Sequence, residues 1–423
     1  MIDNLQDVID NNLCCNCGIC EGICPKNAIK LRLGNDRKAY EPIINKNKCT
    51  NCDTCYLICP GHFVDFNKLN QHFFNKEPED PRIGVYSNCY LGYSKDDNVR
   101  YTSSSGGVIT SLLVYALEND IIDGALVTRM RKDNPFEPEP FIAKTKEEII
   151  EAAKSKYCPV PLSKLINEVV VNDLRVAVVG LPCHIHGIRK AEMLNKSLKN
   201  RIILHLGIFC SHNDTFWQTY SLVSKLGIEE REVHEIRYRG DGWPGNMEVK
   251  LRNGDKVKLP YQEAMYPHIL WMNPLFRCLF CCDLTAELSD LSFGDPWLPE
   301  ITKQEKKGKT LIVCRTEHSE KLLSDAIMNG YINLDKISPE KVKVSGAMMD
   351  SKKKDIKVRF LVRKILNKEL PEYKTKLLKP KFKNYIKGLF VYFNAVSSFN
   401  YFIANNLILN LELWILKKYL KHK

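Results

Sequence analysis

Cysteine spacing constrains this 423-residue chain more than any other feature of its sequence. Eight of its 17 cysteines form two runs near the amino terminus, and each run has the pattern Cys-x2-Cys-x2-Cys-x3-Cys-Pro. The runs are Cys14, Cys17, Cys20 and Cys24, and then Cys49, Cys52, Cys55 and Cys59. Three closely spaced thiolates on a loop can bind three irons of one cube, while the fourth, followed by proline, opens a helix and reaches another cube. The two runs therefore predict two [4Fe–4S] clusters.

Such paired runs are typical of bacterial-type ferredoxins, in which the fourth cysteine of each run binds the other cluster. We expect one cluster to be bound by Cys14, Cys17, Cys20 and Cys59, and the other by Cys49, Cys52, Cys55 and Cys24. A zinc site is the alternative, but it needs four thiolates in two pairs. Cys15 is a spare thiol, and spacing alone assigns the ligand role to Cys14. The runs thus predict a chain that moves electrons.

The length allows two or three domains of roughly 100–200 residues each. We predict an α+β or α/β multidomain chain with a two-cluster ferredoxin module at 1–66, a mixed α/β domain at 82–345 and a basic amphipathic helical tail at 351–423. Residues 67–81 are expected to form a polar linker. Within the module, residues 28–33 alternate like a strand, and Gly34-Asn35-Asp36 can turn the chain after it.

The composition and the first residues bear on cellular location. So many cysteines in a chain of this length argue against a small secreted disulfide scaffold. The opening stretch MIDNLQDVIDNN has neither the basic nor the apolar segment of a signal peptide. No apolar run approaches the roughly 18 residues that a membrane span needs. We therefore expect a cytoplasmic chain.

Two strand–loop–helix units are predicted in the second domain. Residues 175–179 form a buried strand that ends at Gly180-Leu181-Pro182-Cys183 before a helix. Residues 201–209 form another strand that ends at Cys210, and Asp214 is expected to cap the helix after it. Since ligands of open α/β sheets bind beyond the carboxyl ends of the strands, a ligand site is expected at this edge.

Other elements follow from local patterns. Thr145 and Glu148 form a capping box that opens a helix ending near residues 155–157. Asn253-Gly254 predicts a type I′ hairpin between residues 246–252 and 255–259. Residues 310–314 are expected to form a strand, and residues 319–328 a helix.

A serine- and glycine-rich loop precedes another predicted helix. Its residues, Ser103, Ser104, Ser105, Gly106 and Gly107, lead into VITSLLVYALEND, which has helical spacing of apolar residues. Hydroxyls, free amides and the positive end of the helix dipole suit a phosphate. The alternative is a plain helix start with serine as the N-cap.

Four further cysteines lie on loops at element boundaries, and they include a Cys-x2-Cys pair. They are Cys183, Cys210, Cys278 and Cys281. They either share one site or are separate small apolar residues, the usual role of free cysteine. His184 and His186 could be ligands beside Cys183, but we interpret them as the polar first turn of a helix.

Several stretches resemble the beta-subunit family of coenzyme F-420-reducing hydrogenases and related dehydrogenases. They are Ser103–Val108, Ser155-Lys156-Tyr157, Gly180–Cys183, Gly207–Cys210, Tyr238–Gly245, Cys278-x2-Cys281 and Asp290–Trp297. The resemblance implies FAD and one further [4Fe–4S] cluster, with Cys183, Cys210, Cys278 and Cys281 as its ligands. It also implies that Ser103–Gly107, Lys156 and Tyr157 contribute to the flavin site. His184 departs from the family, which often has glutamine there, so the hydride partner could differ.

These features lead to the hypothesis of a flavin-dependent iron–sulfur oxidoreductase. Clusters carry single electrons and a hydride carries two, and a flavin interconverts them. Electrons would pass between a redox partner protein or ferredoxin, the clusters, FAD and a small-molecule hydride partner such as a deazaflavin. The alternatives are a non-catalytic electron-transfer subunit of a larger complex, and a reductase that tailors a pigment or glycan intermediate.

The tail carries the positive charge of the chain. Residues 351–423 contain 18 lysines and arginines against four acidic residues, whereas the whole chain has a net charge of +12. Residues 388–416 are rich in aromatic and aliphatic side chains, as in Leu407–Leu416. Such a segment can lie peripherally on an anionic membrane, or it can pack on its own body or on a partner subunit. We expect no nucleic-acid binding, since basic residues alone are a weak sign of it.

Overall fold

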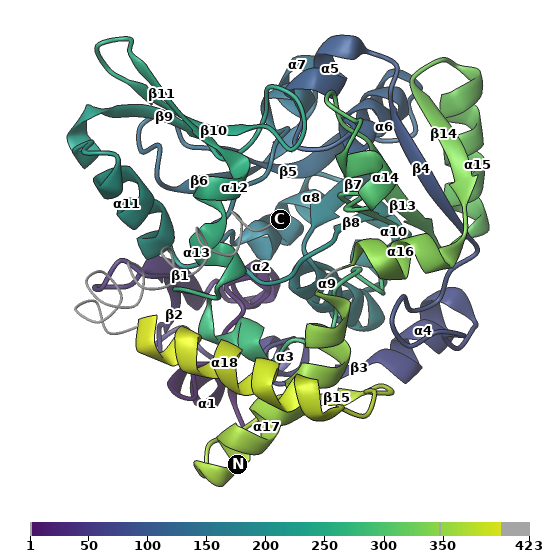
Figure 1. Ribbon diagram of the computed structural model, residues 1–423. Helices are drawn as coiled ribbons and strands as arrows, with labels where there is room; N and C mark the ends of the chain where they lie inside the picture. The colour runs from purple at the N-terminus through teal and green to yellow at the C-terminus, as the bar shows by residue number, and fades with distance from the viewer. Residues whose placement is uncertain (1, 347, 399–423) are drawn as a thin grey trace.

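A computed structural model describes residues 2–346 and 348–398, and its centre is an eight-stranded mixed sheet (Figure 1). The strands lie in the order β14-β4-β13-β12-β8-β7-β5-β6. The four strands β12, β8, β7 and β5 run parallel, and the strands outside them pair antiparallel. In sequence order the bounds are β4 (Asn88–Ser94), β5 (Gly124–Met130), β6 (Pro138–Ala143), β7 (Val176–Gly180), β8 (Ile202–Ile208), β12 (Leu291–Gly294), β13 (Thr310–Cys314) and β14 (Ile332–Ile337). The mixed α/β expectation is confirmed for this part of the chain.

Alternating side chains of the sheet face two hydrophobic layers. Ala125, Val127 and Ala177 pack with α6 (Val108–Glu118), α7 (Lys146–Glu151) and α15 (Glu317–Met328). Leu126, Val176 and Val178 face the opposite layer, because successive strand residues point to opposite faces. That layer contains η1 (Leu162–Leu165), α8 (Ile166–Val171), α9 (Pro182–Leu194) and α10 (Lys196–Arg201). The predicted strand–loop–helix units therefore belong to a sheet that is covered by helices on both faces.

The cysteine-rich module packs against the second layer. Ile19 and Ile58 share its core, and the Gly22 Cα lies so close to Ser163 that a Cβ there would be 2.2 Å from the Ser163 carbonyl oxygen. The elements of the module are α1 (Leu5–Asp10), α2 (Ile19–Ile23), β1 (Ile29–Leu33), β2 (Tyr40–Ile44), α3 (Thr54–Leu57) and β3 (Phe63–Asp65). The strand expected at 28–33 is present and pairs antiparallel with β2. Close contact at Gly22 joins the module to the α/β body.

The linker expected at 67–81 is wrong over its first half. Residues Phe66–Phe74 form α4. Asp65 is its N-cap, and the Asp65 carboxylate accepts the Lys68 amide at 3.0 Å. Phe66 and Leu69 are buried, so the polar residues between them form only the outer face of a helix. The polar composition concealed this amphipathic pattern.

A smaller three-stranded sheet follows β8 in the chain. Its strands are β9 (Val233–Arg237), β10 (Asn246–Leu251) and β11 (Lys256–Pro260), and they pack with α11 (Phe216–Lys225) and α12 (Tyr261–Ala264). The short elements η2 (Glu230–Glu232), α13 (Tyr266–Ile269) and η3 (Phe276–Phe280) belong to the same stretch of chain. The predicted hairpin is present, but its turn is not type I′. Gly254 has a φ of 98°, whereas Asn253 does not have a positive φ, and the Leu251 amide donates to Asp255 across a three-residue loop. Type I′ requires both central residues at positive φ.

The remaining helices complete the body. Short helices lie at α5 (Asp97–Thr102), α14 (Pro299–Thr302) and α16 (Pro339–Ser345). The strand predicted at 310–314 is confirmed as β13, and the helix predicted at 319–328 is confirmed within α15.

Residues 351–398 run back over the module and the η3 turn. They form η4 (Ser351–Asp355), α17 (Ile356–Ile365), β15 (Glu372–Lys374) and α18 (Phe382–Ser398). β15 pairs parallel with β3, and the buried Arg359 donates to the Leu279 carbonyl at 2.6 Å. The described part of the predicted tail therefore packs on its own body, and residues 399–423 lie outside the described residues.

Candidate functional site

A cavity of about 660 Å³ opens at the carboxyl ends of the parallel strands. Gly180 ends β7 and Leu181 follows it, residues 209–211 follow β8, and Gly294 ends β12. All of these residues line the cavity. This is the edge at which the strand pattern predicts a ligand. Its volume lies in the range of roughly 300–1,000 Å³ that small-molecule and cofactor sites occupy.

The serine- and glycine-rich loop forms one wall, and most of its polar groups bind protein. The Ser105 hydroxyl donates to the Lys309 carbonyl at 2.5 Å, and the Ser104 hydroxyl accepts the Ser155 amide at 2.8 Å. Ser103 Oγ is buried and has no hydrogen-bond partner among the described residues. The cavity wall therefore retains the Ser103 hydroxyl for a ligand.

The helix after this loop starts at Gly107, not at a serine. Gly107 is the N-cap of α6, with φ 75° and no side-chain cap, so the expectation of a plain serine-capped helix is wrong. The first amides of a helix have no acceptor within it, and Gly107 to Thr110 line the cavity. The first turn of α6, with its amides and the positive end of the helix dipole, thus borders the ligand space.

Lys156 and Tyr157 line the same cavity from the turn after α7. That helix ends at Glu151, earlier than predicted, and the Lys156 ammonium donates to the carbonyls of Ala152, Ala153 and Lys154 at 2.5–3.0 Å. Burial lowers the pKa of Lys156 to about 7. A lysine in this state can change charge near neutral pH.

The far wall contains a charged and aromatic group that was not assigned a role from the sequence. Arg239 donates to Asp295 at 2.6 Å, and the Trp243 indole donates to the same carboxylate at 2.8 Å. The Tyr261 and Trp297 rings stack at 5.8 Å beside them. Such flat apolar surfaces suit a planar ligand ring.

The cysteines of the two runs gather in two adjoining groups. Cys14, Cys17 and Cys20 each have Cys59 as an electrostatic neighbour. Cys55 likewise faces Cys24, Cys49 and Cys52. Cys20 is also a neighbour of Cys55, so the two groups adjoin.

The four loop cysteines also converge. Cys210 faces Cys278 and Cys281, and Cys183 faces Cys210. The Asn213 amide donates to Cys278 Sγ at 3.4 Å. Lys352, which is only 1% exposed, faces three of these thiols. A buried cation calls for a buried anion, so this set fits a negatively charged thiolate site.

Cys15 lies between the first group and the loop cysteines. Its side chain is hydrogen-bonded to Cys183, and this contact lowers the pKa of Cys15 to about 7. Cys14 instead accepts the Asn16 amide at 3.4 Å. Cys210 lines the cavity. The thiols therefore form a continuous series from the second run, through the first run, to the cavity.

His184 and His186 lie in the first turn of α9, as predicted. The Leu181 amide donates to His184 Nδ1 at 3.0 Å, and His184 Nε2 bonds the Val160 carbonyl at 2.8 Å. His186 Nε2 bonds Asp283 at 2.8 Å. His184 lines the cavity, but both of its ring nitrogens bind backbone groups. The histidine that replaces the family's glutamine therefore stabilises the start of α9.

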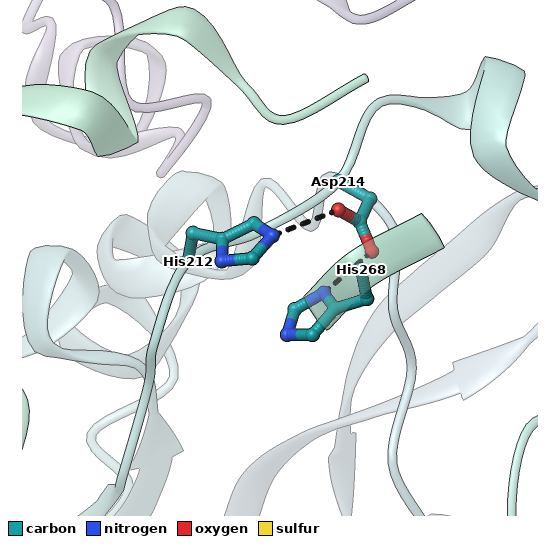
Figure 2. A group of neighbouring side chains, drawn as sticks. All are labelled: His212, Asp214 and His268. Carbon is teal, nitrogen blue, oxygen red and sulfur yellow. Dashed lines mark hydrogen bonds and ion pairs between the residues drawn. The ribbon is translucent and has the colours of Figure 1, made fainter. Parts of the chain in front are cut away.

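A second cluster of titratable groups lies on the cavity wall (Figure 2). Asp214 is not the expected helix cap, because α11 begins after Thr215. Its buried carboxylate accepts from His268 Nδ1 at 2.8 Å, and His212 Nε2 lies 3.2 Å from its other oxygen. His268 comes from α13, 54 residues further along the chain. Only the His-x-Asp pattern after a strand could have suggested this cluster.

The fold, the thiol series and the cavity define an iron–sulfur protein of oxidoreductase type. Residues 89–167 and 173–340 match the amino- and carboxyl-terminal families described as coenzyme F-420 hydrogenase/dehydrogenase, beta subunit. Residues 44–85 match the 4Fe-4S single cluster domain of ferredoxin I. The chain belongs to the coenzyme F-420 hydrogenase/dehydrogenase beta-subunit family, as its motifs indicate.

Its relatives carry related names. A coenzyme F-420-dependent sulfite reductase of Methanocaldococcus jannaschii is 27% identical over 79% of this chain, and the chain spans about half (49%) of that relative's length. A coenzyme F-420 hydrogenase subunit beta of Methanosarcina barkeri is 27% identical over 60% of this chain and 82% of the relative. A solved chain of the F-420-reducing [NiFe] hydrogenase complex of Methanosarcina barkeri has a TM-score of 0.54 and 24% identity, and the likeness covers 69% of this chain and 98% of that chain. The structural likeness supports the fold.

Proposed function

We propose that this protein is an iron–sulfur flavoprotein that moves electrons between one-electron carriers and a hydride donor or acceptor of the coenzyme F-420 deazaflavin type. The observation that carries the proposal is the series of cysteine sites that ends at Cys210 in the cavity wall. Each site adjoins the next, so single electrons can pass along the series. The cavity at its end has room for a two-electron ligand.

Three [4Fe–4S] clusters fit the cysteine sets. One would be held by Cys14, Cys17, Cys20 and Cys59, another by Cys24, Cys49, Cys52 and Cys55, and the third by Cys183, Cys210, Cys278 and Cys281. Backbone amides donate to Cys14, Cys24, Cys59 and Cys278, which stabilises thiolate ligands. Lys352 would balance charge at the third set.

FAD fits the cavity as its resident cofactor. The free Ser103 hydroxyl and the open start of α6 suit a phosphate, and Tyr157 and Lys156 line the adjoining wall. When bound, a flavin exchanges two electrons as hydride and one electron at a time with clusters. The chain would bind and orient it, and Lys156 would hold or release a proton at Nζ.

The test is the cofactor content of protein purified without oxygen. We expect flavin absorbance and about twelve irons per chain, as three cubic clusters require. Flavin-free protein with about eight irons would contradict the proposal. A panel of reduced deazaflavin, NADH, NADPH and reduced ferredoxin would then identify the donor.

A second function is supported by the names of the relatives. Several are subunits of hydrogenases or dehydrogenases, so this chain could serve as the electron-transfer subunit of a larger complex. Turnover of reduced deazaflavin with an artificial acceptor by the isolated chain would favour the enzyme. Turnover only after a partner protein is added would favour the subunit.

We further propose that α18 rests on an anionic membrane surface. Its inward face carries small or polar residues such as Gly388, Asn394 and Ser398, whereas Phe382, Ile386 and Phe393 are 59–81% exposed. Lysines flank this apolar face, and residues 351–398 are strongly basic. Aromatic residues beside lysines suit the interface of an anionic bilayer. No helix among residues 2–346 and 348–398 is long and apolar enough to cross a bilayer.

A further inference from the structure

The cavity wall carries a hydrogen-bonded chain of three side chains that the proposed function has not used. Asp214 Oδ2 bonds His268 Nδ1 at 2.8 Å, and His268 Nε2 bonds Ser211 Oγ at 2.9 Å. Ser211 and His268 both line the cavity, and Asp214 is fully buried behind them. Figure 2 shows the two imidazoles on opposite oxygens of the carboxylate.

The geometry fixes which nitrogen of His268 can gain or lose a proton. An ionised carboxylate can only accept, so Nδ1 carries a hydrogen toward Asp214. Nε2 is then the variable nitrogen, and it faces the Ser211 hydroxyl and the cavity. A buried carboxylate that orients an imidazole in this way also stabilises its protonated form.

The second imidazole lies outside this hydrogen-bonded chain. His212 stacks between His268 and Trp271, with ring centroids 3.8 and 4.0 Å away. The other groups near the pair are Tyr157, whose ring lies 5.6 Å from His268, and Lys352, a neighbour of His212. Of the two imidazoles, His268 is the one whose Nε2 is hydrogen-bonded to Ser211.

We propose that Ser211, His268 and Asp214 form a proton relay for a hydride donor whose oxidation also releases a proton. The inference rests on the proposed function. A donor oxidised in the cavity would lose a C–H hydride with both electrons, which the flavin would accept when bound, and an N–H proton, which would pass to Ser211 Oγ. The Ser211 proton passes to His268 Nε2, and Asp214 stabilises the resulting imidazolium.

The relay narrows the substrate class. A dihydro-deazaflavin gives up a hydride and a proton when it is oxidised. A reduced nicotinamide gives up a hydride alone and leaves no proton for a base. A base beside the cavity therefore fits a dihydro-deazaflavin as the donor. To accept the donor's proton, His268 Nε2 must be unprotonated before the reaction.

The test compares His268→Gln with His318→Gln, a change of an exposed histidine on α15. Ser211→Ala is the second variant, since it leaves the His268–Asp214 pair intact. In anaerobic holoprotein, reduced coenzyme F-420 should reduce the clusters on the order of 100-fold more slowly in His268→Gln. Reduction by dithionite and iron content should match the control.

Calorimetry with holoprotein that dithionite has already reduced gives a readout apart from activity, because no electrons can then pass. His268→Gln and His318→Gln should bind reduced coenzyme F-420 as tightly as the wild type does, because the relay moves a proton only when the donor is oxidised. A rate in His268→Gln equal to that of His318→Gln, or a slow His268→Gln that also binds the donor less tightly, would overturn the relay alone. A wild type that does not oxidise reduced coenzyme F-420 would overturn both the relay and the proposed function.

Discussion

Two adjacent thiols, Cys14 and Cys15, share Cys59 as a neighbour but have different hydrogen bonds. Cys14 accepts the Asn16 amide, whereas Cys15 bonds Cys183. We predict that Cys14→Ser loses one cluster, about four irons per chain, and that Cys15→Ser keeps all three. Iron content and low-temperature EPR of protein purified anaerobically measure this. Loss of a cluster from Cys15→Ser alone would reverse the ligand assignment.

His205 is buried between two carboxylates of the body. It lies 2.7 Å from Glu192 and 3.0 Å from Asp290. Burial and Arg189 oppose its protonation, but the two carboxylates prevail and raise the pKa of His205. Its contribution to stability is therefore fully present below the unfolded pKa near 6.5 and is lost as the pH rises through the raised folded value.

Replacing His205 should lower the free energy of unfolding most at acidic pH, where this histidine is protonated. We expect His205→Gln to lower the free energy of unfolding by about 3 kcal/mol near pH 6 and by less as the pH rises, because it leaves Arg189 as the one positive charge between the buried Glu192 and Asp290. Anaerobic urea titrations between pH 6 and 9 measure this free energy, and His234→Gln, a change of an exposed histidine, is the control. A loss that does not change with pH would contradict the assigned charge.

The start of α6 is the part of the cavity wall that the proposed flavin site uses for its phosphate. Gly107 has φ 75°, and a Cβ there would lie 3.1–3.2 Å from Val99 and Ser94. Gly227 has nearly the same φ of 74°, with nothing within 4 Å. Alanine costs about 1–2 kcal/mol of backbone strain at either position.

Only Gly107→Ala should lower the flavin-to-protein ratio, because only this residue caps the helix at the cavity. We expect a several-fold loss of bound flavin in Gly107→Ala and none in Gly227→Ala, with similar losses of thermal stability. Absorbance of released flavin gives the ratio. Equal flavin content in the two variants would show that the start of α6 does not contribute to the cofactor site.

Local sequence patterns predicted the elements that depend on residues close together in the chain. Cysteine spacing, the strand residues 310–314 and the hairpin near Asn253-Gly254 each depend on neighbours in sequence. The hairpin's turn type was wrong because pairing of Leu251 with Asp255 decides it. The linker was wrong because the apolar stripe of α4 becomes visible only when its body partners are known.

Contacts between distant segments were beyond sequence reasoning. Asp214 and His268 meet across 54 residues, and the pattern around Asp214 indicates a helix cap equally well. Cys15 had no assigned role because the sequence does not show that Cys183 lies beside it. The four loop cysteines could be grouped only with the help of family resemblance.

The exposed face of α18 is the surface of the whole molecule that is proposed to contact the membrane. Phe393 is 65% exposed on α18, and Met328 is 73% exposed on α15, far along the chain. We predict that Phe393→Glu reduces sedimentation with phosphatidylserine-containing vesicles several-fold, since it places a charge in the apolar face. Met328→Glu changes the net charge equally and should bind as the wild type does. Equal binding by both variants, or binding of a partner subunit to α18 instead, would contradict the membrane contact.

In the proposed function, two-electron chemistry in the cavity feeds single electrons into the cysteine series. An anaerobic titration of the holoprotein with reduced coenzyme F-420 tests this transfer most directly. Each equivalent should restore the fluorescence of oxidised deazaflavin and deliver two electrons to the flavin and clusters, as followed by absorbance and EPR. Clusters that stay oxidised, although dithionite reduces them readily, would contradict the proposed function.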